Sequence, residues 1–279
     1  MPTADLSLRD EYAAAVERLA GRTLDALRGV GGAVAPAAPD TGPAPDSGSV
    51  PRPVLAAARV LGPDVLAPQV LGAAGADEQA VLLLTEAHRA FPLAAFPAPA
   101  DPGSPADAGA DRSADEERAA GAVLVAAWRD WATTVLLSRT PGTFSGTPFP
   151  EPAGDPARDQ GAPHPGHAPR PEPYAWQAWS VRMAQLSALA LPGLDGPVHD
   201  AAREHTLDLA RGAVRSLLRC DYRVAARLTR WLAWLAADGR QLPLEVEPVL
   251  DRIRAVGDGS ARTALELAVA DHLLSGAAS

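Results

Sequence analysis

Apolar residues recur at helical spacing in several segments of this chain, and proline-rich runs separate those segments. In the first segment, residues three or four positions apart form one side: Tyr12, Val16, Leu19, Thr23 and Leu27. This spacing predicts an amphipathic helix. The longest segment with a helical pattern and no proline is 203–239. We predict helices at residues 8–28, 54–60, 77–91, 113–138, 174–191, 248–256 and 261–274, and two more between 198 and 239 that meet at 220–221.

The runs between these helices are rich in proline, glycine and alanine, a composition that does not build a core. They divide the chain into five parts. We expect an N-terminal helix at 1–31, a flexible linker at 32–53, a helical region at 54–139 interrupted by a flexible loop at 92–114, a proline-rich disordered loop at 140–173 and a C-terminal helical region at 174–275. The predicted fold class is all-α, and short connections between helices favour an antiparallel helical bundle.

The two helices between 198 and 239 have apolar positions that predict their buried faces. The inward positions expected in the first are Leu207, Ala210, Val214, Leu217 and Leu218. Those expected in the second are Val224, Leu228, Trp231 and Leu235. An aspartate, Asp221, is placed to cap the second helix, and Asp238-Gly239 to end it.

All six tryptophans occur as pairs three residues apart, which is a helical spacing. Five of them lie on faces that are already apolar, so core packing accounts for Trp128, Trp131, Trp176, Trp179 and Trp231. The same five could instead line a pocket between helices for an apolar or cationic ligand. The sixth, Trp234, differs because a helical wheel places it within about 60° of three arginines.

The residues that join the last helices carry a resemblance to a known family. The run Cys220-Asp-Tyr-Arg-Val-Ala225 has a small residue, Asp, Tyr and Ala in the order found at the turn of a tetratricopeptide hairpin. Gly257-Asp258 followed by Ala264 repeats part of this order. The resemblance implies antiparallel helix pairs stacked side by side, so a short helical-hairpin array is the alternative to a simple bundle.

Composition excludes several classes of function. The chain has no lysine, and all 25 of its basic residues are arginine, which excludes Schiff-base and pyridoxal phosphate chemistry and P-loop nucleotide binding. The net charge of −9 disfavours nucleic acids and membrane surfaces as partners. The single cysteine, Cys220, excludes an internal disulfide. The N-terminus resembles no signal peptide and no apolar run is long enough to span a membrane, so we expect a cytoplasmic protein.

Candidate catalytic and metal-binding residues do not form a recognisable set. His199, Asp200, Glu204 and His205 are close in sequence, but their side chains do not converge on one face of a helix as a metal site requires. Two further histidines, at 164 and 167, lie in the proline-rich loop. We therefore predict no catalytic residues, no metal site and no cofactor.

Charge is the feature that stands out. Residues 203–230 carry a net charge of +4, whereas the rest of the chain carries −13. We predict that a basic, partly aromatic face for an acidic partner is formed by Arg215, Arg219, Arg223, Arg227, Arg230 and Trp234. The alternative is that acidic residues of the same chain neutralise these arginines.

The leading functional hypothesis is a non-catalytic helical scaffold or regulatory protein. Its partner would be a protein with an acidic or amphipathic surface, bound through the arginine-rich face. The alternative hypothesis is a small-molecule binding protein or enzyme whose pocket lies among the tryptophan pairs.

Overall fold

A computed structural model describes residues 3–30, 50–75, 77–92, 114–139 and 175–277. The described residues form helices and no strand, which confirms the all-α prediction. The predicted linker and both predicted loops lie outside these residues, apart from their edges. The helices are α1 (Thr3–Leu27), α2 (Arg52–Leu61), η1 (Gly62–Leu66), α3 (Ala67–Val70), α4 (Glu78–Ala90), α5 (Ala114–Arg139), α6 (Ala175–Gln185), η2 (Ser187–Leu189), α7 (Pro197–Glu204), α8 (Thr206–Leu218), α9 (Tyr222–Ala237), α10 (Val246–Val256) and α11 (Ala261–Ala277).

Side-chain caps begin three of these helices. The Asp77 carboxylate accepts hydrogen bonds from the backbone N–H groups of Gln79 and Ala80 at the start of α4. Asp221 accepts from the N–H of Val224 at the start of α9, as predicted. Ser260 accepts from the N–H of Thr263 at the start of α11, which is also as predicted. Each cap satisfies a backbone donor that has no partner within the helix.

Two predicted helices are interrupted where the sequence pattern is continuous. The helix expected over 174–191 leaves α-helical geometry after Gln185 and continues as η2. In this region the carbonyls of Ala188, Leu189 and Ala190 accept hydrogen bonds from side chains of other helices. A regular helix would use such carbonyls for its own i→i+4 bonds, so tertiary hydrogen bonds replace helical ones here.

The second interruption separates α7 from α8 at His205, where one helix was expected. The hydroxyl of Thr206 donates to the carbonyls of Ala202 and Arg203, at 3.3 and 3.0 Å. A threonine that binds the carbonyls of the preceding turn in this way bends a helix. The chain therefore changes direction between α7 and α8 without a proline or glycine to mark the place.

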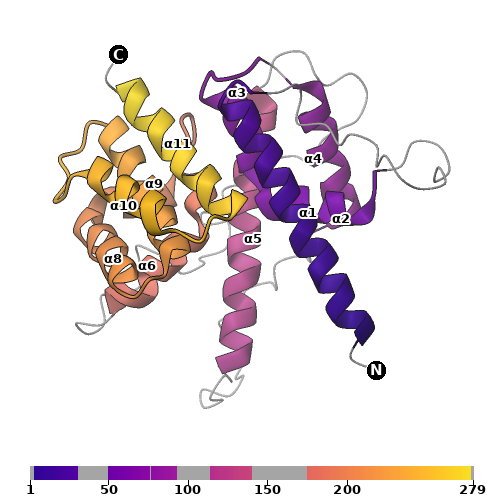
Figure 1. Ribbon diagram of the computed structural model, residues 1–279, viewed down its shortest axis with the longest axis horizontal. Helices are drawn as coiled ribbons and strands as arrows, with labels where there is room; N and C mark the ends of the chain where they lie inside the picture. Colours follow the sequence, from indigo (N-terminus) through magenta and orange to yellow (C-terminus); the bar gives the residue numbers. More distant parts are fainter. Residues whose placement is uncertain (1–2, 31–49, 76, 93–113, 140–174, 278–279) are drawn as a thin grey trace, which may run out of the picture.

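Helix α9 is the centre of the C-terminal half. It packs against α6, α8, α10 and α11, and it is buried on nearly every side from Ala225 to Leu235. In Figure 1 these helices lie on the left, α1 to α4 lie on the right, and α5 runs between the two groups. The groups are joined where α1 packs on α11 and where η1 packs on α5. One core therefore runs through both halves.

None of the described helices combines the length and the apolar character needed to cross a membrane.

Candidate functional site

The structure divides the six residues of the predicted basic face into buried and exposed members. Arg230 is fully buried and Trp234 is 6% exposed, so the prediction that these two lie on a surface is wrong. The helical wheel placed them together correctly, but it could not show that four helices surround α9. The face that carries Arg230 and Trp234 is an interior face.

Arg230 is held by groups from three distant parts of the chain. Its guanidinium lies 2.7 Å from an oxygen of Asp64 on η1 and 3.0 Å from an oxygen of Glu266 on α11. It also donates to the carbonyls of Ala190 and Ala188, at 3.2 and 3.5 Å. The guanidinium is thus surrounded by acceptors, as a buried charge requires.

The two buried carboxylates respond differently to this surrounding. Burial raises the pKa of Asp64, although Arg230 opposes that effect. Burial would also raise the pKa of Glu266, but Arg230 and Arg227 together hold it below its usual value. A hydroxyl, that of Ser187, donates to Glu266 at 2.9 Å. Arg230 therefore lies between two buried carboxylates, one from η1 and one from α11.

The side chain of Trp234, which belongs to α9, is buried against α7. Its ring centroid lies 5.0 Å from that of His199, and the Arg203 guanidinium carbon lies 4.9 Å from the Trp234 ring centroid. Arg203 is itself paired with Asp195, Asp200 and Asp238. The one tryptophan expected beside a row of arginines therefore contacts a different arginine, which comes from another helix.

Arg223 and Arg227 have acidic neighbours within the chain. Arg223 lies 3.5 Å from Asp258 at the surface, and Arg227 lies 3.5 Å from Glu266 in a half-buried position. For these two residues the structure favours the alternative in which the protein neutralises its own arginines. The carboxylates come from α11 and the loop before it, which no local pattern could reveal.

Arg215 and Arg219 do belong to a basic surface. They line a groove of about 1140 Å³ between α5, α6, α8 and the start of α9, together with Arg129 and Arg182. We call this the basic groove. Among the side chains that the structure describes, Asp221 is the one acidic residue that lines it, and Arg182, Arg215 and Arg219 form no ion pair with any of them. The described lining of the groove therefore has four arginines and one carboxylate.

An exposed apolar stripe lies on α8 beside the basic groove. The side chains of Leu207, Val214 and Leu218 are 50%, 42% and 81% exposed, so the prediction that they face inward is wrong. The buried positions of α8 are Asp208, Leu209, Ala210, Gly212 and Ala213. Spacings of seven and four residues place the three exposed residues on one face of the helix.

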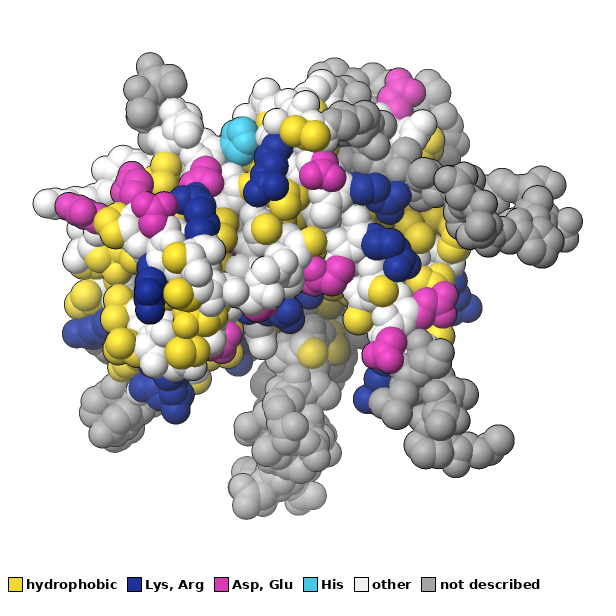
Figure 2. All heavy atoms as spheres, in the orientation of Figure 1, with side chains coloured by type: hydrophobic (Ala, Val, Ile, Leu, Met, Phe, Trp, Pro, Cys, Tyr) yellow, Lys and Arg dark blue, Asp and Glu magenta, His cyan; other side chains and the backbone are white. Residues whose placement is uncertain are grey.

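Arginines border this stripe. Arg211, Arg215 and Arg219 follow one another at intervals of four residues on α8, so they form a row along its side. On the left of Figure 2, over the C-terminal helices, hydrophobic side chains cluster at the surface with arginine side chains at their edge. This combination of apolar and cationic groups is typical of a surface that binds protein.

The five tryptophans of the pocket hypothesis are dispersed. Trp128 and Trp231 are 1% and 0% exposed and belong to the core. The other three, Trp131, Trp176 and Trp179, are half-buried. Neither the basic groove nor the second cavity described below is lined by a tryptophan, so the structure does not bring the five together around either space.

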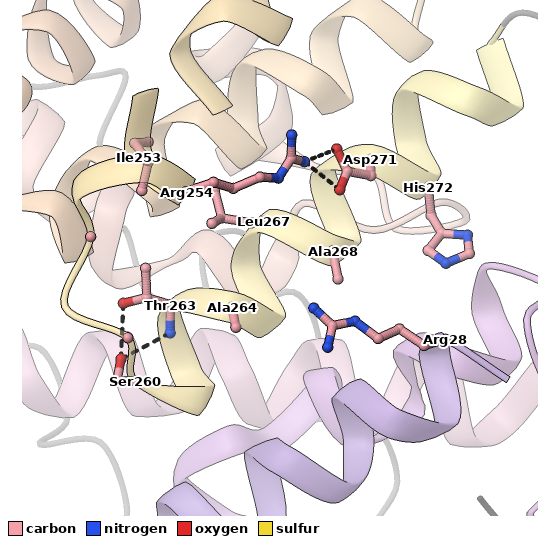
Figure 3. Close-up of a pocket in the computed structure, with 12 residues that line it drawn as sticks. Arg28, Ile253, Arg254, Ser260, Thr263, Ala264, Leu267, Ala268, Asp271 and His272 are labelled. Carbon is pink, nitrogen blue, oxygen red and sulfur yellow. Dashed lines mark hydrogen bonds and ion pairs between the residues drawn. The ribbon is translucent and has the colours of Figure 1, made fainter. Parts of the chain in front are cut away.

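A second cavity of about 330 Å³ lies between α1, α10 and α11 (Figure 3). Arg254 reaches across it from α10 and forms an ion pair with Asp271 of α11. The imidazole of His272 on α11 is hydrogen-bonded to the carbonyl of Leu27 at 3.0 Å. Because these polar groups already serve to join three helices, the cavity offers less to a ligand than the basic groove.

Comparison with protein-family models, with curated proteins and with solved structures finds no match to this chain.

Proposed function

We propose that this protein is a non-catalytic scaffold or regulator that binds an acidic, amphipathic helix of a partner protein on α8 and the basic groove. One observation carries the proposal: among the side chains that the structure describes, Arg182, Arg215 and Arg219 have no ion-pair partner and line a groove with one carboxylate, in a chain whose net charge is −9. A positive groove on an acidic protein favours partners with negative charge.

The apolar stripe supports a helix as the bound element. Leu207, Val214 and Leu218 follow the axis of α8 over 12 residues, or about three helical turns. A partner helix laid along them would contribute apolar residues at positions i, i+4 and i+7. Its carboxylates, on the side toward the groove, would face the arginine row of α8. The stripe would provide buried area, and the arginines would set orientation.

Charge argues against a second copy of this chain as the occupant. A two-fold dimer through α8 would bring the same patch of both molecules together. The row Arg211, Arg215 and Arg219 of one copy would then lie near the row of the other, and like charges at close range are destabilising. An acidic partner has the opposite effect.

We also propose that α8 and α9 form a hairpin of the tetratricopeptide kind. The connection between them is 219–221, and the two helices pack closely on each other. The connection between α10 and α11 is also short, at 257–260, but these two helices contact each other little and pack mainly on α9. This arrangement supports a scaffold role because it leaves one side of α8 free.

The test uses the purified chain and two synthetic helical peptides with the same apolar face. One peptide carries glutamate along its polar edge and the other carries lysine. Fluorescence anisotropy should show binding of the glutamate peptide, weakening as salt rises, and no comparable binding of the lysine peptide. Reversing the charge of the groove with the triple substitution Arg182→Glu, Arg215→Glu and Arg219→Glu should weaken binding of the glutamate peptide at least about tenfold. Each lost charged contact contributes about 1 kcal/mol or more to the binding free energy.

A matched control changes the net charge equally at exposed arginines elsewhere, with Arg9→Glu, Arg89→Glu and Arg240→Glu. This variant should bind the glutamate peptide nearly as well as the unchanged protein. Leu218→Ser should weaken binding without altering the preference for glutamate over lysine. Equal binding of both peptides, or equal loss in both triple variants, would show that the basic groove is not the site.

A further inference from the structure

The cavity between α1, α10 and α11 places a charged side chain beside an apolar wall (Figure 3). Ala264, Leu267 and Ala268 of α11 form this wall, and Ile253 of α10 adds to it. Arg28 follows the last residue of α1, and in Figure 3 its side chain extends toward Ala264 and Ala268. The volume, about 330 Å³, lies at the lower end of the range for pockets that hold small molecules, about 300–1000 Å³.

Other polar groups of this cavity have partners within the protein. Arg254 is paired with Asp251, at 2.7 Å, and with Asp271. At the end of the cavity nearest the loop between α10 and α11, the hydroxyl of Ser260 donates to that of Thr263 at 3.0 Å. These contacts hold the walls in place and leave the groups that make them little capacity for a ligand.

Arg28 differs from them because it has no ion-pair partner among the side chains that the structure describes. The described lining contains two arginines and one carboxylate, and Arg254 is paired with that carboxylate. The remaining positive charge therefore lies at Arg28. The backbone beside it is held against α11, because the Nε2–H of His272 donates to the carbonyl of Leu27 at 3.0 Å.

These features match an organic anion with a single negative charge and an apolar body. A guanidinium binds both oxygens of a carboxylate with paired N–H donors, so Arg28 can hold such a head group. Ala264 and Ala268 would contact the hydrocarbon part, and removal of apolar surface from water favours binding. A dianion would bring a second charge, for which the described lining offers no further unpaired arginine.

We propose that this cavity binds a small monocarboxylic acid, with the carboxylate at Arg28 and the apolar body along Ala264, Leu267 and Ala268. The ligand would contact α1 and α11, which belong to different groups of helices and pack on each other. Its binding should therefore stabilise the folded protein. The site shares no lining residue with the basic groove, so it does not depend on the partner helix proposed above.

The test measures binding of hexanoate to the full chain by ligand-observed NMR titration. Two analogues separate the parts of the ligand, because acetate has the carboxylate without the chain and hexanamide has the chain without the charge. We expect saturable binding of hexanoate and weaker binding of both analogues. Hexanamide that binds as tightly as hexanoate would overturn the proposal, since the charge of Arg28 would then play no part.

Substitutions locate the site. Arg28→Gln should weaken hexanoate binding about threefold to fivefold, the usual effect of an exposed ion pair. It should melt at nearly the same temperature as the unchanged protein, because Arg28 is exposed. The matched control is Arg240→Gln, which removes one positive charge at another exposed position and should leave hexanoate binding unchanged.

The triple variant of the basic groove, with glutamate at 182, 215 and 219, should also bind hexanoate like the unchanged protein. Loss of hexanoate binding in that variant, or undiminished binding by Arg28→Gln, would place the carboxylate elsewhere and overturn the proposal.

Discussion

His199 shows how one buried side chain joins three helices. It is fully buried on α7, and its Nε2–H donates to the carbonyl of Leu189 at 3.0 Å. Its ring packs edge-on against Trp231 and at a tilt against Trp234. Its Nδ1 has no partner among the described residues. The site therefore fits a neutral imidazole, with one nitrogen protonated, and does not solvate an imidazolium.

The buried environment of the His199 imidazole predicts that the stability of the protein depends on pH. Burial lowers the pKa of His199, and burial also lowers that of His88. The unfolded chain, with histidine near its usual pKa of about 6.5, then binds more protons than the folded chain at mildly acidic pH. The free energy of unfolding should be at its full value above about pH 6.5 and fall as the pH drops below it.

Urea unfolding between pH 5 and 8 would measure this dependence, with a slope of at most about 1.4 kcal/mol per pH unit for each histidine. His199→Gln keeps a donor near Leu189 but cannot take up a proton, so it should reduce the slope. His88, whose pKa burial also lowers, should contribute to the slope that remains. An unchanged slope in His199→Gln would assign the acid sensitivity to other groups.

At the scale of helices, a close approach between α6 and α8 shapes the basic groove. A Cβ atom added to Gly212 of α8 would lie 2.7 Å from the Cβ of Ser180 on α6 and 3.0 Å from a methyl group of Leu228 on α9. The three helices can meet at this point because residue 212 has no side chain. Gly212 and Ser180 also line the groove, so the contact fixes one of its walls.

Gly212→Ala should destabilise the protein by about 1–3 kcal/mol, the usual effect of overpacking a well-filled core. Gly121→Ala is the matched control, because its helix α5 leaves open space around position 121. It should be neutral or stabilise by up to about 1 kcal/mol, since alanine favours a helix more than glycine. Chemical denaturation measures both. A neutral Gly212→Ala would mean that α6 moves away easily and that the groove wall is not fixed.

At the scale of the whole molecule, the two groups of helices are connected by packing and by charge. Helix α1 lies against α11, and η1 lies against α5. Asp64 of η1 contacts Arg230 of α9, and Glu17 of α1 caps α11. Separation of the groups would expose apolar surface and leave Arg230 without one of its two carboxylates.

We therefore expect one cooperative unfolding transition. All tryptophans lie between 128 and 234, so their fluorescence reports on the C-terminal half and α5, whereas far-ultraviolet circular dichroism reports on every helix. The two midpoints in urea should coincide.

Asp64→Ala should lower the free energy of unfolding by about 3–5 kcal/mol, as expected for a broken buried ion pair, and should shift both midpoints together. The exposed Asp10→Ala should change stability by less than about 0.5 kcal/mol. Separate midpoints would show two independent units.

Local patterns in the sequence determined most of the helices and their caps. The positions of α1, α2, α4, α9 and α11 follow from apolar spacing, and Asp77, Asp221 and Gly239 mark ends that the structure contains. These features depend on residues within one or two turns of each other, so the sequence is sufficient to predict them. The spacing of Arg215 and Arg219 likewise placed them on one side of a helix, and both line the basic groove.

Which face of each helix is buried was decided by the tertiary structure. Arg230 is interior because Asp64 and Glu266, which lie 166 positions before it and 36 after it, supply its counter-charges. Leu218 is exposed because α9 packs on the other side of α8. Arg129 and Arg182 join the groove from α5 and α6. Contacts between residues so distant in sequence leave no local pattern, so only the folded chain determines where charge is neutralised and where it remains free to bind.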